Sequence, residues 1–189
     1  MPYYGERRAR GSSRRMISRD PRESVVGMTQ GVLDVRRARQ WLADRPEVDD
    51  ERMGVMGISL GGIMAALSGA ADPQFRSIAV MIAGGKLARS IWENPIPEAG
   101  QFREAWQAAG GTQESFERIL DEVDPARYGE RLRDRRVLLV AADHDEVFPQ
   151  ASVRALWDST GRTAKLVWMP EVGHYTCIRF LFREVDRMI

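Results

Sequence analysis

The chain has 189 residues, of which 43% are hydrophobic and 29% charged, and its formal net charge is +1. Domains usually span roughly 100–200 residues, so the length predicts one domain, and the composition is that of a folded globular protein. A single cysteine excludes an internal disulfide and a multi-cysteine zinc site, and two histidines leave little room for a histidine-rich centre. We therefore expect neither a metal nor a cofactor.

The basic residues are almost all arginines, because Lys86 and Lys165 are the only lysines, and many arginines fall within residues 1–23. Such a cluster is typical of a nucleic-acid-binding arm or an organelle-targeting segment. Arginine dominates the rest of the chain too, and no binding motif accompanies the cluster. We interpret it as a solvated loop, expect no nucleic-acid partner, and, without a recognisable signal peptide, expect a cytoplasmic protein.

The predicted elements alternate between helix and strand. Apolar residues at spacings of three and four predict a first helix, and short uniformly apolar runs predict buried strands. In chain order we expect a helix over 24–45, a strand over 52–58, a helix over 60–71, strands over 77–83 and 136–142, a helix over 152–159, a strand over 165–169 and a helix over 178–189.

This alternation predicts an α/β fold with a doubly wound, mostly parallel sheet. Residues 53–71 carry no charge and could span a membrane by length, but a buried strand followed by a buried helix explains their hydropathy, so we expect no membrane span. Residues 84–135 are too long for a plain crossover and predict a helical cap insertion. The single domain of residues 1–189 therefore divides into 1–23, 24–83, 84–135 and 136–189.

The segment Gly57-Ile58-Ser59-Leu60-Gly61 has the pattern G-x-S-x-G between a predicted strand and a predicted helix. A serine on such a sharp turn projects its hydroxyl above the sheet, and the Leu60 backbone N–H points to where an oxyanion forms. We expect side chains at Gly57 and Gly61 to clash where strand and helix approach, and Gly62 to extend this close contact.

A serine nucleophile needs a base that an acid orients. Asp145 follows the strand over 136–142, and His174 lies in a loop before the last predicted helix. Serine hydrolases whose nucleophile lies on a turn between a strand and a helix have their catalytic residues in the chain order serine, acid, histidine, and Ser59, Asp145 and His174 follow this order.

The segments RMGVMGISLGG, VLLVAADHDEVFP and MPEVGHY resemble the nucleophile elbow, acid loop and histidine loop of the α/β-hydrolase superfamily. Within it, the branch of dienelactone hydrolases, acetyl xylan esterases and prolyl-oligopeptidase-like proteins is the most similar, from about Ser24 to the C-terminus. The resemblance implies a Ser59–His174–Asp145 triad with the Leu60 N–H in the oxyanion hole. Dienelactone hydrolases proper use cysteine, so Ser59 indicates esterase-like chemistry on a small ester or acyl substrate.

Other residues near these motifs have competing interpretations. Asp143 could be the acid, but its position favours a turn cap, and His144 is expected at the surface. Glu146 and Glu171 are expected to be solvated, and Cys177 to be a buried small hydrophobe. Three aromatic residues line a substrate pocket or belong to the cap's own core: Trp92, Phe102 and Trp106. Tyr175, next to His174, is a further candidate for the pocket.

The family fold normally begins with several strands before the nucleophile elbow, and one loop among them donates a second oxyanion N–H. The sequence has no room for them, so we expect an N-terminally truncated hydrolase. The lost donor would cost roughly 10²–10³ in rate, and the strand over 52–58 would become an exposed edge through which copies could associate. The alternative function is a non-catalytic binding module with a hydrolase-like fold.

Overall fold

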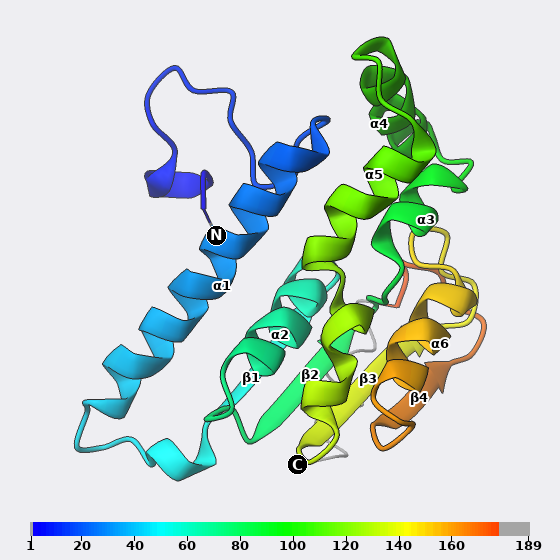
Figure 1. Ribbon diagram of the computed structural model, residues 1–189. Helices are drawn as coiled ribbons and strands as arrows, with labels where there is room; N and C mark the ends of the chain where they lie inside the picture. Colours follow the sequence, from blue (N-terminus) through cyan, green and yellow to red (C-terminus); the bar gives the residue numbers. More distant parts are fainter. Residues whose placement is uncertain (1, 178–189) are drawn as a thin grey trace.

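Four short apolar segments form one parallel sheet in the computed structural model, which describes residues 2–177 (Figure 1). The strands are β1 (Gly54–Ile58), β2 (Ser77–Met81), β3 (Arg136–Ala142) and β4 (Lys165–Met169), in the order β1-β2-β3-β4. The predicted α/β class is thus confirmed. Register pairs Ile58 with Met81 and Ala142 with Met169, so the carboxyl ends of the strands meet at one edge of the sheet.

The start of β1 and the end of β2 differ from the prediction, and each difference has a local cause. The predicted strand over 52–58 starts later because Asp50–Arg52 forms a 3-10 turn that the Asp49 side chain caps. The predicted strand over 77–83 ends at Met81 because Ile82 takes a positive φ of 44°, which is not an extended conformation, although its N–H still donates to the Val140 carbonyl at 2.7 Å. The strands β3 and β4 match their predicted bounds.

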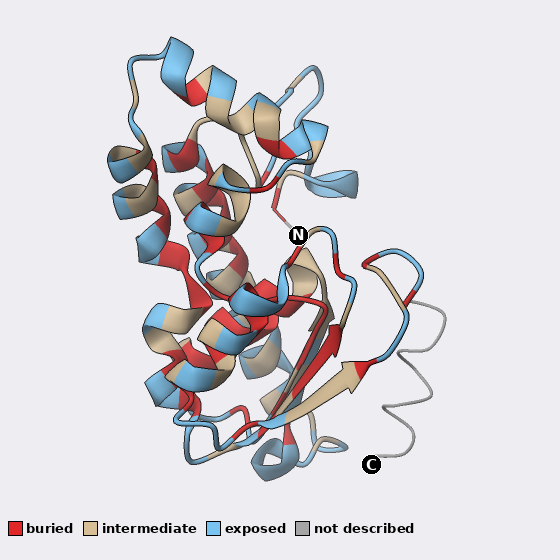
Figure 2. Ribbon diagram, turned by 90° about the vertical axis from the view of Figure 1, so that its right-hand side faces the viewer, coloured by how far each residue is buried: buried red, intermediate tan, exposed pale blue. Residues whose placement is uncertain are grey.

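The described helices cover one face of the sheet (Figure 2). They include α1 (Pro21–Ala43), α2 (Leu60–Ala71) and α6 (Gln150–Ser159). Right-handed crossovers between strands that follow one another in the sheet place their helices on the same face, and the strand order does not reverse within residues 2–177. The described strands therefore form one wing of the predicted sheet, and the helix predicted over 178–189 lies outside the described residues.

The helix α1 begins earlier than predicted because its start signal lies upstream of the apolar pattern. The Asp20 side chain accepts a hydrogen bond from the Arg22 N–H, and Pro21 occupies the first helical position. Both features stabilise a helix N-terminus. The helix α6 likewise starts directly after Pro149, at Gln150.

The segment predicted as a cap forms α3 (Leu87–Trp92), α4 (Pro97–Ala108) and α5 (Gln113–Leu120), followed by 3-10 turns η3 (Asp121–Val123) and η4 (Pro125–Leu132). In Figure 1, α3 and α4 lie beyond the carboxyl ends of the strands. The buried Asp124 carboxylate accepts the Leu87 N–H at 2.6 Å and the Ala126 N–H at 2.8 Å. Burial raises the pKa of Asp124 although both donors oppose it. This carboxylate ties the start of α3 to the start of η4.

The strand β1 lies at an edge of the sheet and pairs only with β2 among the described strands. Its Met56 is 52% exposed. A hollow of about 290 Å³ lies beside this edge, between β1, α1 and α2, and Val55, Met56 and Gly61 are among its lining residues. The expected open edge is therefore present in the described part of the chain.

Candidate active site

Ser59 forms the sharp turn between β1 and α2. Its φ of 54° and ψ of −121° lie in a region that residues with a side chain rarely adopt. The Ser59 N–H donates to the Met81 carbonyl at 2.9 Å, and this bond holds the turn against β2. A backbone conformation of this kind persists only where its surroundings enforce it, and it presents the hydroxyl beyond the end of the sheet.

The glycines around Ser59 have different structural reasons. A Cβ at Gly57 would lie 2.0 Å from the Gly61 carbonyl oxygen, and one at Gly62 would lie 2.9 Å from the Met81 oxygen, so both contacts need glycine. The predicted clash at Gly61 is wrong, because a Cβ there meets nothing within 4 Å. Gly61 instead borders the hollow beside the β1 edge.

Three side chains from the carboxyl ends of β1, β3 and β4 form a continuous hydrogen-bonded row. The His174 Nε2 lies 2.9 Å from the Ser59 Oγ, and its Nδ1 lies 3.0 and 2.9 Å from the two carboxylate oxygens of Asp145. His174 and Asp145 are 4% and 9% exposed. The structure thus brings together the serine, histidine and aspartate that the sequence singled out.

The Asp145 carboxylate is held by the backbone of its own loop. Its Oδ1 accepts the Val147 N–H at 2.8 Å and the Phe148 N–H at 2.7 Å. A carboxylate beside Nδ1 stabilises the tautomer with the proton on Nδ1, which leaves Nε2 as an acceptor facing the Ser59 hydroxyl. The phenyl ring of Phe148 packs near the imidazole, with ring centroids 5.7 Å apart. The row can therefore move a proton from the serine to the histidine.

Glu146 contacts the histidine loop, contrary to the expectation that it is merely solvated. Its side chain is exposed, but Oε2 accepts the His174 backbone N–H at 2.8 Å. The buried Asn94 amide donates to the Glu146 and Val147 carbonyls at 3.0 and 3.3 Å, which links the segment before α4 to the acid loop. No local pattern in the sequence could have identified either contact, because both join distant loops.

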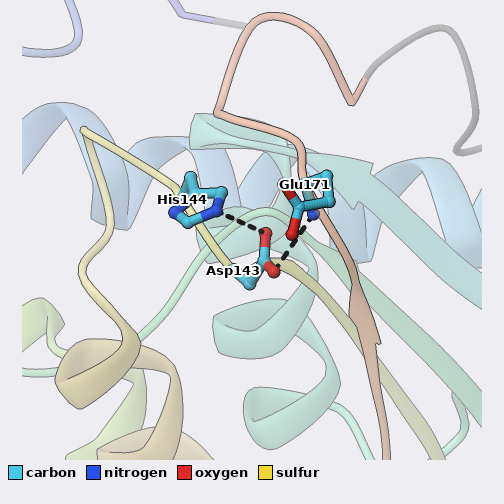
Figure 3. A group of neighbouring side chains, drawn as sticks. All are labelled: Asp143, His144 and Glu171. Carbon is cyan, nitrogen blue, oxygen red and sulfur yellow. Dashed lines mark hydrogen bonds and ion pairs between the residues drawn. The ribbon is translucent and has the colours of Figure 1, made fainter.

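Asp143 has the turn-capping role that its position favoured. Its carboxylate accepts the backbone N–H of Glu171 at 3.1 Å (Figure 3). It also accepts the backbone N–H of Val172, at 3.3 Å. Partial burial acts to raise the pKa of Asp143, but these backbone donors outweigh it and the pKa lies below its usual value. Asp143 thereby positions the loop that carries His174 without contacting the imidazole.

Asp143, His144 and Glu171 form the one group of ligating side chains in residues 2–177 whose spacing would suit a cation. Their ligand atoms lie within 4.8 Å of one another. Figure 3 shows His144 and Glu171 on either side of the Asp143 carboxylate. His144 and Glu171 are exposed, Asp143 is already engaged by backbone donors, and exposed groups of this kind are common without an ion, so we assign no metal to them.

The helix α2 begins directly after Ser59, which is its N-cap residue. Leu60 is the first residue of α2, and its N–H has no acceptor within the helix. A helix N-terminus also favours negative charge through its dipole. The Leu60 N–H therefore belongs to the class of unpaired helix-end donors that can bind an anion.

A cavity of about 290 Å³ opens at Ser59 between α1, the helices α3 to α5 and the acid loop. Of the four aromatic candidates, Phe102 and Tyr175 line it, whereas Trp92 and Trp106 are not among its lining residues. These two indoles pack against Phe116, with ring centroids 5.4 and 6.5 Å apart. Trp92 and Trp106 thus pack within the segment over 84–135 rather than lining the cavity.

Cys177 is fully buried, and its thiol donates to the His174 carbonyl at 3.2 Å. Burial raises the pKa of Cys177 to about 11, and the nearby Asp145 carboxylate adds to the effect. The thiolate is the reactive form, so its fraction at mildly alkaline pH is small in the folded chain. We expect iodoacetamide to alkylate Cys177 about a hundredfold more slowly in the native protein than in urea at pH 8. Equal rates, measured by mass spectrometry, would contradict this burial.

No helix within residues 2–177 combines the length and the apolar character needed to cross a bilayer. The uncharged stretch over 53–71 is divided instead between β1, the Ser59 turn and α2.

The parallel sheet, the strained serine turn and the hydrogen-bonded row define an α/β-hydrolase fold. The chain belongs to the prolyl oligopeptidase family, whose sequence profile matches residues 28–184. It is 28% identical over 158 residues to Esterase YjfP of Escherichia coli (strain K12), an alignment that covers 78% of this chain and 59% of that protein.

Two solved structures share the fold. Acetyl xylan esterase 1 from Thermoanaerobacterium sp. JW/SL YS485 is 20% identical with a TM-score of 0.70, covering 86% of this chain and 54% of that one. The acetyl xylan esterase from Paenibacillus sp. R4 is 19% identical with a TM-score of 0.71, covering 85% and 53%. The chain therefore spans between half and two thirds of the length of these relatives.

Proposed function

We propose that the chain is a serine hydrolase that cleaves carboxylic esters through an acyl-enzyme. The observation that carries the proposal is the row from Ser59 Oγ through His174 to Asp145, with bonds of 2.9 to 3.0 Å. Membership of a family of hydrolases and the likeness to a protein named as an esterase support it.

In the proposed reaction, the Ser59 hydroxyl oxygen attacks the ester carbonyl carbon while His174 Nε2 accepts its proton. The Leu60 N–H stabilises the negative charge on the carbonyl oxygen. The imidazolium then donates its proton to the leaving alcohol as the ester C–O bond breaks. Water attacks the acyl-enzyme in the same way, and the carboxylic acid leaves as Ser59 regains its proton. Asp145 orients the imidazole and stabilises its positive charge throughout.

Inhibitors separate this mechanism from metal-dependent hydrolysis. We expect the purified chain to hydrolyse p-nitrophenyl esters, and preincubation with a sulfonyl fluoride to remove at least about nine tenths of the rate, because the reagent sulfonylates an activated serine with loss of fluoride. EDTA should leave the rate unchanged. Activity that disappears with EDTA and survives the sulfonyl fluoride would overturn the proposal.

A second candidate function is a non-catalytic binding module, and the open edge of β1 is the observation that favours it. The strand has no described partner on its outer side, and Met56 there is 52% exposed. Unpaired strand edges promote association, and lysine on such an edge opposes it.

We expect the chain to self-associate at micromolar concentration and Met56→Lys to lower the associated fraction severalfold, measured by sedimentation velocity. Val26→Lys is the matched control, because Val26 is 51% exposed on α1 and does not line the hollow beside β1. A wild-type chain that stays monomeric, or two variants with the same effect, would contradict association through β1.

A further inference from the structure

Apolar side chains from three parts of the chain line the cavity at Ser59. Ile17 and Met28 belong to the segment that begins α1, Ile96 and Phe102 to the start of α4, and Phe116 and Leu120 to α5. Its volume of about 290 Å³ is at the small end of ligand pockets, which measure roughly 300–1,000 Å³. The space suits one compact hydrocarbon group rather than an extended polymer.

The polar residues in the lining are largely engaged with the protein itself. The Ser24 hydroxyl donates to the Ser18 carbonyl and accepts the Ser18 N–H, at 3.1 and 2.9 Å. The buried Asn94 side chain donates to the acid-loop carbonyls and accepts the Ile96 N–H at 3.0 Å. Glu98 is exposed in the first turn of α4. A sugar or an anionic group inside the cavity would lose water without gaining equivalent partners.

We infer that the preferred substrates are esters that carry an apolar aliphatic or aryl group on one side of the scissile ester bond, held in this cavity. The inference rests on the proposed ester hydrolysis and specifies its substrate class. Removing hydrocarbon from water favours binding in proportion to its area, so each added methylene that fits should raise kcat/KM about fourfold until the cavity is full.

Two ester series test the inference and show which side of the ester fills the cavity. The first lengthens the acyl group of p-nitrophenyl esters from acetate to octanoate, and the second lengthens the alcohol of alkyl acetates. We expect kcat/KM to rise at least about tenfold along one series. Acetate as the best acyl group together with a flat alcohol series would overturn the inference.

Variants in α4 connect the preference to the cavity. Ala99 is 5% exposed and lines the cavity. If the acyl group enters the cavity, Ala99→Phe should reduce the ratio of the octanoate rate to the acetate rate at least about tenfold. If the alcohol enters, the same variant should reduce the corresponding ratio of long to short alkyl acetates. Ala108→Phe is the matched control, because Ala108 is exposed on the same helix and does not line the cavity. Phe102→Ala enlarges the cavity and should move the optimum to longer chains, which provides a second test if Ala99→Phe fails to fold. Unchanged ratios in folded Ala99→Phe and Phe102→Ala would contradict the assignment.

A binding measurement separates failure of this inference from failure of the proposed function. In the Ser59→Ala variant, which cannot form a covalent adduct there, 2-octanone should raise the unfolding temperature and acetone should not. An active enzyme whose Ser59→Ala variant ignores 2-octanone would refute the apolar site and leave ester hydrolysis intact. Binding of 2-octanone by a chain that hydrolyses no ester would refute the proposed function and leave an apolar ligand site.

Discussion

Replacing Ser59 by alanine is expected to lower kcat for p-nitrophenyl esters by roughly 10⁶-fold, the size of the loss when a triad nucleophile is removed. The reason is that, among the described residues, the His174 Nε2 has one hydrogen-bond partner, the Ser59 Oγ at 2.9 Å. The substitution removes only the hydroxyl of the side chain. The backbone N–H of residue 59 can still donate to the Met81 carbonyl, so we expect the fold to persist.

The control for this variant is Ser13→Ala, which removes an exposed hydroxyl far from the active-site row in the sequence. Steady-state kinetics of both purified variants measure the effect. A Ser59→Ala variant that retains more than about one hundredth of the wild-type kcat would show that the activity arises elsewhere.

Replacing Asp145 by asparagine is expected to lower kcat roughly 10⁴-fold while leaving the chain folded. An asparagine oxygen can still accept the Val147 and Phe148 N–H groups, as the Asp145 Oδ1 does at 2.8 and 2.7 Å. Its amide would then donate to the His174 Nδ1. That bond favours the tautomer with the proton on Nε2, which cannot accept the proton of Ser59.

Asp143→Asn is the matched control, because it makes the same chemical change two residues earlier, away from the imidazole, and its amide oxygen still accepts one of the two N–H groups, of Glu171 and Val172, that the Asp143 oxygens accept. We expect its kcat to remain within severalfold of wild type. A large loss in Asp143→Asn with little loss in Asp145→Asn would reassign the acid to Asp143.

The parts of the fold that the sequence predicted well are those with complete local signals. The helix α2 and the strands β3 and β4 have their predicted bounds, because each is an apolar run that ends at an unambiguous turn. The start of α1 was missed because the cap formed by Asp20 and Pro21 lies outside the apolar pattern. The end of β2 was missed because the positive φ of Ile82 has no signature in an isoleucine.

The residues of the site likewise divide into those with a local sequence signal and those without one. Ser59, Asp145 and His174 could be singled out because each lies at the carboxyl end of a predicted strand, where a parallel sheet gathers such residues. The roles of Glu146 and Asn94 depend on contacts between distant loops that no spacing encodes. The same limit applies to the aromatic residues, since only packing against Phe116 separates Trp92 from the cavity-lining Phe102.

Covalent labelling tests the central claim most directly. A fluorophosphonate probe reacts with a serine whose hydroxyl a neighbouring base has activated. We predict one adduct per chain, located on Ser59 by tandem mass spectrometry, and no adduct in the Ser59→Ala variant. A folded wild-type chain that remains unlabelled, or that is labelled at another residue, would contradict the account.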